Sequence, residues 1–317
     1  MTAIFSQTGF SNQAAENASH GLLTVEVVNG TANGTPVTND EVIVQLFQHN
    51  QLLSSLEGKV SAEGRALFDN VPSGEHMVAV AQARHQNMMF SGPAVSLDPA
   101  KEKFTANIRV FDVSVDQSRL SVKNHHFIIK THPEFLEITE FMQLSNASDM
   151  AVSSAKTDSL GRPIVIEIML PEGFQNLKTS GYFVESALVR TKDGFYDTMA
   201  VPPGDFQVTF SYTLDITSSA MDMIKKITLP TSHFMAFIDS GEAQFHGLSE
   251  DEKQTMDRNG VPTEYFRREN LTPADVVAFR ITGLRAGAKK WVTWVTLAVV
   301  FGVLVIFAVV RSRPAKK

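Results

Sequence analysis

Three histidines, His125, His126 and His132, form the densest group of potential metal ligands in the sequence. Adjacent side chains of a strand point to opposite faces, so His125 and His126 cannot both reach one ion from regular β-structure. His132 precedes Pro133, which favours a loop at that position. We therefore interpret the three as ordinary polar residues of strands and turns, and we assign no metal-binding and no cofactor-binding residue.

Sequence motifs of the common catalytic sites are missing. The sequence contains no H-E-x-x-H or H-x-x-E pair for zinc, no G-x-S-x-G nucleophile turn and no glycine-rich phosphate loop after a strand. It has no cysteine, which excludes disulfides, thiolate metal sites and a cysteine nucleophile. The acidic pairs Glu137/Glu140 and Asp251/Glu252 are interpreted as solvated faces. We assign no catalytic residue and predict that the protein is not an enzyme.

An apolar run at Met88, Met89 and Phe90 is the candidate for an exposed binding element. Methionine suits adaptable binding surfaces, but it also fills irregular spaces in cores. Because the run continues a strand-rich region, we expect core packing here, with binding as the alternative.

Residues 21–113 are expected to form an antiparallel β-sandwich. Short apolar runs rich in Val, Ile, Thr and Phe repeat at roughly ten-residue spacing between turn residues. The expected strands cover residues 22–28, 41–49, 52–60, 76–84 and 103–111. Residues 1–20 are expected to be a flexible segment, and they do not match a signal peptide because they have no basic start and no long apolar run.

Two segments of this region carry a family resemblance. They are the P-V-x-x-x-x-V-x-V-x-L segment from Pro36 to Leu46 and the run G-R-A-L-F-D-N-V-P-S-G-E-H from Gly64 to His76. With the strands around them, they resemble carboxypeptidase regulatory-like domains, which are transthyretin-like β-sandwiches. The resemblance covers about a third of the chain. It implies a non-catalytic module of a kind usually found in exported or cell-surface proteins.

Residues 114–284 are expected to form a second sandwich, with Ig-like topology. The expected strands cover residues 127–130, 135–144, 164–171, 182–191, 195–204, 206–216 and 225–238, separated by turn residues. The run VPPGDFQVTFSYTLD (residues 201–215) resembles bacterial proteins that couple a regulatory-like domain to another β-domain and one C-terminal span. That resemblance implies an architecture and no particular activity. Residues 247–275 are polar, and Ser249 can cap a short helix, so we expect a polar helical connector there, with a docking segment as the alternative.

The segment from Trp291 to Val310 has twenty consecutive uncharged residues and is followed by the basic run RSRPAKK. Twenty helical residues span about 30 Å, the thickness of the hydrocarbon core of a bilayer. We therefore predict a transmembrane helix over 291–310, within an anchor and short basic tail over 285–317. The predicted fold class is mainly β, with two tandem antiparallel β-sandwich domains and one C-terminal transmembrane helix.

Net charge and domain content limit the partners. The chain carries −6, and because four basic residues follow the apolar segment, the part before it carries about −10. A chain this acidic is a poor nucleic-acid binder, since phosphate contacts need clustered Lys and Arg. The expected partners are the lipid bilayer, through residues 291–310, and a protein partner in a membrane complex.

Basic residues are balanced on the two sides of the apolar segment, so they do not fix its orientation. The β-domains favour a plasma (inner) membrane protein with the bulk of its chain outside the cytoplasm. A tail-anchored chain with a cytoplasmic bulk is the alternative.

These features favour a non-catalytic, membrane-anchored protein whose β-domains bind a partner, as an accessory or structural subunit of a membrane protein complex. The alternative is a cell-surface module that recognises carbohydrate or protein. An enzyme with an unrecognised site is the third interpretation, and a pocket that gathers His125, His132 and an acidic side chain would support it.

Overall fold

The computed structural model describes residues 19–285 except positions 240, 242, 250, 251 and 259. The described chain divides into two compact units, each with its own sheets. Unit 1 comprises the chain up to Arg119 together with Asn146–Val165 and Thr198–Gly204, and unit 2 comprises Leu120–Ser145, Ile166–Asp197 and the chain from Asp205 onward.

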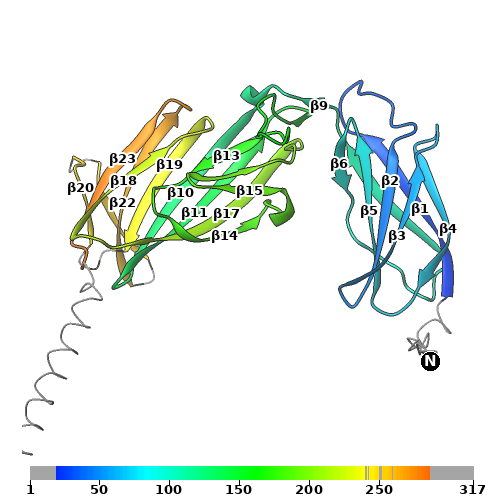
Figure 1. The fold of residues 1–317 in the computed structure, drawn as a ribbon, viewed down its shortest axis with the longest axis horizontal. Helices are drawn as coiled ribbons and strands as arrows, with labels where there is room; N and C mark the ends of the chain where they lie inside the picture. The colour runs from blue at the N-terminus through cyan, green and yellow to red at the C-terminus, as the bar shows by residue number, and fades with distance from the viewer. Residues whose placement is uncertain (1–18, 240, 242, 250–251, 259, 286–317) are drawn as a thin grey trace, which may run out of the picture. The chain divides into compact units, whose positions relative to one another are not determined.

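Unit 1 contains a two-layer β-sandwich (Figure 1). One layer has the strand order β4-β1-β8, and the other has the order β3-β2-β5-β6 with β7 paired to β5. The bounds are β1 (Ser19–Asn29), β2 (Glu41–Gln48), β3 (Gln51–Lys59), β4 (Arg65–Ser73), β5 (Met77–His85), β6 (Met88–Ser91), β7 (Val95–Ser96) and β8 (Lys103–Val110). Alternate residues of β1, β2, β5 and β8 are buried, as half-buried strands require, and they form one apolar core.

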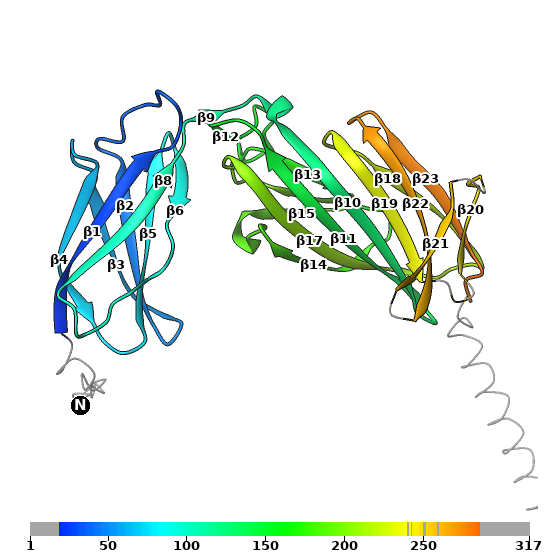
Figure 2. The ribbon, with the colours of Figure 1, turned by 180° about the vertical axis from the view of Figure 1, so that it is seen from behind.

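Unit 2 is built on a wide seven-stranded sheet with the order β14-β17-β11-β10-β19-β22-β21 (Figure 2). Two three-stranded sheets, β13-β16-β15 and β18-β23-β20, complete it. The strands of the wide sheet are β10 (Leu120–Thr131), β11 (Phe135–Asn146), β14 (Gln175–Gly181), β17 (Gly204–Asp215), β19 (Thr231–Asp239), β21 (Gln254–Arg258) and β22 (Val261–Leu271). The others are β13 (Ile166–Met169), β15 (Leu188–Thr191), β16 (Gly194–Asp197), β18 (Ala220–Lys226), β20 (Gln244–His246) and β23 (Val276–Thr282).

Phenylalanine rings fill the space between the layers of unit 2. Phe245 of β20 and Phe279 of β23 pack edge-to-face on Phe266 of β22, with ring centroids 5.0 and 5.3 Å away. Phe195 of β16 packs in the same way on Phe210 of β17, at 5.3 Å. The core of unit 2 therefore lies between the wide sheet and the two smaller sheets.

The prediction of purely antiparallel sandwiches is wrong. β8 runs parallel to β1, β19 runs parallel to β10, and the short strands β9 (Val113–Ser114) and β12 (Ala151–Val152) are parallel too. A parallel pair needs a crossover connection. After the first strand, the chain must return to the end of the sheet at which that strand began before the second strand can run in the same direction. Strands of the other layer supply it: β2, β3 and β5 to β7 come between β1 and β8, and β18 comes between β10 and β19.

The predicted transmembrane helix is a second correction to the fold class. Among the residues that the structure describes, no helix is long and apolar enough to cross a membrane. The helices found there are the three-residue 3-10 turns η1 (Gln117–Arg119) and η2 (Glu185–Ala187). The segment 291–310, for which the helix was predicted, lies outside the described residues. The fold class in the described part of the chain is thus mainly β, in several sheets.

The expected helical connector over residues 247–275 is also wrong. Most of this segment forms β21 and β22, the last two strands at one side of the wide sheet. The two strands pair as an antiparallel hairpin, in which Thr255 faces Glu264 and Met256 faces Thr263. Gly260, which directly precedes β22, has φ +81, a conformation that suits a hairpin turn.

Candidate functional site

The structure separates the two adjacent histidines. On β10, His125 is buried on the core side of the wide sheet. His126 lies on the outer face, where its ring is 6.2 Å from that of Phe141 and 5.5 Å from that of Phe237. The alternation of the strand gives the two imidazoles different environments, so they share no site.

His132 lies apart from both, in the turn that joins β10 to β11. Its ring stacks on Phe135, and its Nε2 is 3.2 Å from Oε2 of Glu137 at the surface. Within the described ranges, no group of three or more His, Cys, Asp or Glu is arranged to hold a metal ion.

A cluster of four buried polar residues lies in the core of unit 2: His125, Glu140, Tyr212 and Lys225, here called the buried charged cluster. Glu140 is completely buried, so its interpretation as part of a solvated face is wrong. Its Oε2 is 2.7 Å from Nε2 of His125 and 2.6 Å from Nζ of Lys225, while Oε1 accepts a hydrogen bond of 2.9 Å from the hydroxyl of Tyr212. The carboxylate thus has three donors in the core of unit 2.

Burial and mutual charge set the ionisation of this cluster. Burial by itself raises the pKa of Glu140, but Lys225 and His125 outweigh it, and the pKa of Glu140 lies below its ordinary value. Burial lowers the pKa of His125, and burial together with the Glu140 charge raises the pKa of Tyr212. A carboxylate and an ammonium therefore form the ion pair, and a neutral imidazole and a phenol donate to the carboxylate.

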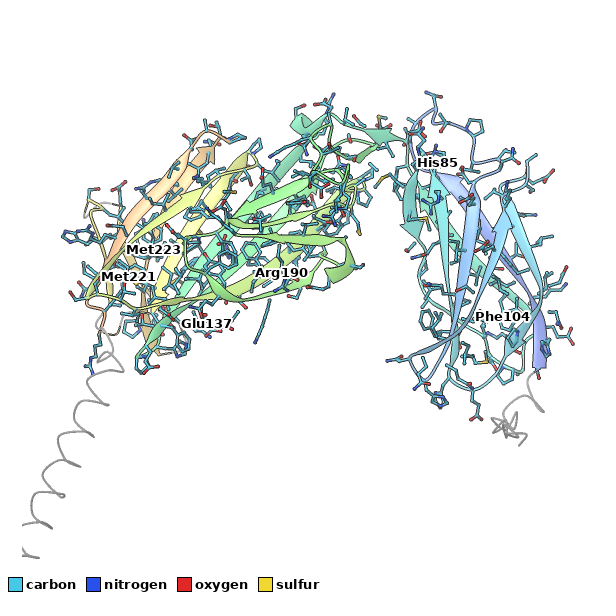
Figure 3. All side chains as sticks on the ribbon, viewed as in Figure 1. His85, Phe104, Glu137, Arg190, Met221 and Met223 are labelled. Carbon is cyan, nitrogen blue, oxygen red and sulfur yellow. The ribbon has the colours of Figure 1, made fainter. Side chains whose placement is uncertain are left out.

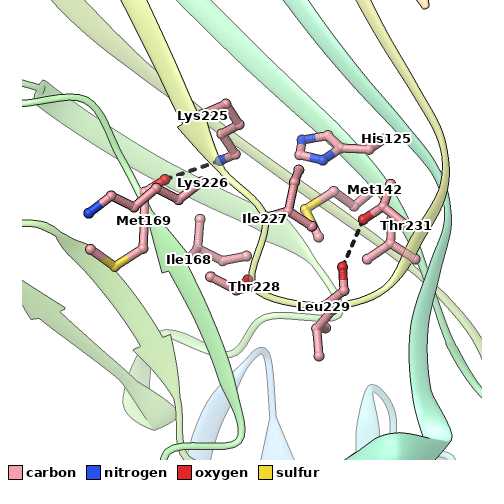
Figure 4. Close-up of a pocket in the computed structure, with 11 residues that line it drawn as sticks. His125, Met142, Ile168, Met169, Lys225, Lys226, Ile227, Thr228, Leu229 and Thr231 are labelled. Carbon is pink, nitrogen blue, oxygen red and sulfur yellow. Dashed lines mark hydrogen bonds between the residues drawn. The ribbon is translucent and has the colours of Figure 1, made fainter. Parts of the chain in front are cut away.

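A small cavity borders this cluster (Figure 4). It is lined by His125 and Lys225 together with apolar side chains such as Met142 and Ile168. Its volume is about 10 Å³, which is room for about one water molecule. Ligand pockets are larger by an order of magnitude or more. An imidazole beside a carboxylate can act as a general base, but the cavity beside His125 has room for about one water molecule.

A row of four rings crosses the outer face of the wide sheet. Phe141, His126, Phe237 and Tyr265 come from the neighbouring strands β11, β10, β19 and β22, and we call them the aromatic row. Successive ring centroids are 6.2, 5.5 and 5.7 Å apart. Each side chain is partly exposed, although its sequence neighbours point into the core. The row therefore places aromatic surface on the side of the sheet that faces away from the smaller sheets.

Apolar and amide side chains border the aromatic row. Ile128 lies opposite Phe237 in the register of β10 and β19, and Met235 lies opposite His126; both are partly exposed. Asn124 donates a hydrogen bond of 2.9 Å from Nδ2 to Oε1 of Gln143. Aromatic rings and methionine are enriched in protein interfaces and are surrounded there by a polar rim, which is the composition of this face.

A second histidine cluster lies in unit 1, at the end of the sandwich opposite to Phe104 (Figure 3). His85 is buried between two carboxylates, with Nδ1 2.7 Å from Oδ2 of Asp40 and Nε2 3.0 Å from Oδ1 of Asp112. Asp112 also accepts hydrogen bonds from Asn29 and from Thr35. Burial raises the pKa of Asp112, but the bonds from His85, Asn29 and Thr35 prevail and lower it to about 2.

Sequence reasoning missed both clusters and the aromatic row. One signal was present: Glu140 interrupts the apolar face of residues 135–144, and a charge at a core position requires a partner. No signal pointed to Lys225, because it comes from a different sheet. The aromatic row contributes one ring per strand, so it forms no motif along the chain.

The apolar run from Met88 to Phe90 packs mainly into the core of unit 1, as expected. On β6, Phe90 belongs to the core, and Met88 packs against it. Met89 is the exposed member of the run. The run is therefore mainly part of the core, and it offers a single exposed methionine as a contact.

No protein-family model matches the chain, and no curated protein matches it. Among solved structures, it is similar to a "putative nutrient binding protein" from Legionella pneumophila, with 7% identity and a TM-score of 0.33, covering 54% of this chain and 70% of that one. It is also similar to a "putative protease" from Parabacteroides distasonis, with 11% identity and a TM-score of 0.32, covering 52% of this chain and 40% of that one. Similarities this low assign neither a family nor a function.

Proposed function

We propose that this protein is a non-catalytic binding protein that docks a protein partner on the outer face of the wide sheet, as an accessory or structural subunit of a complex. The aromatic row carries the proposal. Four partly exposed rings lie next to one another across neighbouring strands, and aromatic rings supply much of the binding energy of interfaces. The titratable groups in the core of unit 2 have no cavity of ligand size beside them, which favours binding over catalysis.

Site-specific photo-crosslinking tests this proposal. A photoreactive amino acid replaces Phe237 or Tyr265 in the full chain, and the matched controls carry it at Ile224 or Val276, which are exposed on the opposite layer of unit 2. We expect a discrete protein adduct from the two row positions and none from the controls. Equal labelling at all four positions, or labelling at the controls alone, would contradict the proposal.

A carbohydrate ligand is the second candidate. The hydrogen-bonded amides of Asn124 and Gln143 lie beside the rings, and sugar hydroxyls could bond to such amides while the sugar ring covers an aromatic face. Titration with soluble oligosaccharides distinguishes the two functions. Saturable binding of one glycan that Tyr265→Ala abolishes, without any protein adduct, would favour the carbohydrate.

A further inference from the structure

Strand β3 in unit 1 has an unpaired edge. It is the terminal strand of its sheet, and its only partner among the described residues is β2. Seven of its nine residues are exposed and the other two are partly so, whereas β2 and β5 bury alternate residues. From Gln51 to Ser55 both faces of the strand are open. An antiparallel edge of this kind presents alternating N–H and C=O groups to solvent.

This edge lacks two of the features that keep other edges from pairing, short length and proline. Natural edges are protected by short length, proline, bulges and charges. β3 is nine residues long, contains no proline and carries its charges, Glu57 and Lys59, at one end. Leu52 and Leu53 at the other end are 54% and 52% exposed. β3 also carries one bulge: Leu52 pairs with Phe47 and Ser54 pairs with Leu46, so Leu53 is an extra residue without a partner on β2.

A hollow lies at the charged end of the strand. It has a volume of about 440 Å³, is open to solvent, and is lined by Glu57 and Lys59 of β3. Across the sheet, it is lined by Glu41 and Arg84, whose carboxylate and guanidinium are 3.1 Å apart, and by Ile43. β3 thus has an apolar end at Leu52 and Leu53 and a polar end at Glu57 and Lys59.

We propose that β3 binds an extended segment of a partner protein as an added strand. A row of alternating donors and acceptors is satisfied by another strand, and hollows beside the edge select its side chains. The segment would place apolar residues beside Leu52 and Leu53, one for each face of the sheet, and a charged or polar residue in the hollow at Lys59. This surface belongs to unit 1 and uses no residue of the aromatic row, so it goes beyond the function proposed above.

Peptides selected from a phage-displayed random dodecapeptide library on the full chain test this inference. We expect them to be rich in β-branched residues, and we expect hydrogen exchange to slow at residues 51–59 when the synthetic peptide binds. In the variant carrying Leu52→Lys and Leu53→Lys, affinity falls by about tenfold or more. Ile224→Lys and Phe237→Ser, in unit 2, leave the affinity unchanged. An unchanged affinity in the double lysine variant, or protection elsewhere, would overturn the inference.

Methylated peptides give a readout that does not depend on the folding of variants. N-methylation of every second peptide amide removes the N–H donors that face β3. In a second peptide, methyl groups on the remaining amides remove the donors that face away from β3. We expect one set to abolish binding and the other to leave it intact, because an added strand bonds on one side only. Equal effects of the two sets would overturn the inference. So would dimerisation of the chain that the double lysine variant abolishes, because a second copy would then occupy the edge.

Discussion

At the residue scale, the buried ion pair of Glu140 and Lys225 predicts a large loss of stability when one partner is removed. Both groups are buried, so removing one leaves an uncompensated charge in the core. We expect Lys225→Met to lower the free energy of unfolding by about 3–5 kcal/mol. The control is Lys123→Met, which removes an exposed pair with Asp205 and should cause a much smaller loss of stability.

Urea unfolding of the single variants and of the double variant Glu140→Gln/Lys225→Met measures the coupling. The double variant removes both charges, so its loss should be smaller than the sum of the two single losses. A loss in Lys225→Met no larger than in Lys123→Met would show that the pair is not buried as described.

The carboxylate of Asp112 predicts the acid dependence of unit 1. Its pKa is about 2 in the folded chain and about 4 in the unfolded one, so its contribution to stability is complete above about pH 4. That contribution is lost as the pH falls from about 4 towards about 2. We expect Asp112→Asn to be less stable at neutral pH and to lose less stability over this range, in thermal melts at a series of pH values. Asp69→Asn, which changes an exposed side chain on β4, should keep the wild-type dependence.

At the element scale, Gly194 is required for β16 to fit between β13 and β15. Its φ is +144, and a Cβ atom there would lie 2.0 Å from the carbonyl oxygen of Ile168. We expect Gly194→Ala to lower the free energy of unfolding by about 3 kcal/mol or more. Alanine would be strained at this φ, and the neighbouring backbone would also have to move. Gly161 has φ +77 but no atom within 4 Å, so Gly161→Ala should cost only the strain, about 1–2 kcal/mol. Equal losses in thermal unfolding would contradict the packing of β16.

Strands with a clear period of two are the elements that the sequence predicts well. The expected strands at 41–49 and 103–111 correspond to β2 and β8, whose burial alternates residue by residue. β14 was missed, because QNLKTSG is polar and buries only Leu177. Parallel pairing was missed because local periodicity is the same in both directions of a strand. The buried charged cluster depends on contacts between sheets, which leave no local pattern.

At the scale of the whole molecule, two separate cores imply two unfolding transitions. Leu46 is fully buried in the core of unit 1, and Phe234 is fully buried in unit 2. We expect Leu46→Ala to lower the free energy of unfolding of unit 1 by about 2–5 kcal/mol. We expect Phe234→Ala to lower that of unit 2 by about 3–5 kcal/mol. In calorimetry, each variant should lower one transition and leave the other in place. One shared transition, lowered equally by both variants, would mean that the two cores unfold together and that binding at one unit stabilises the other.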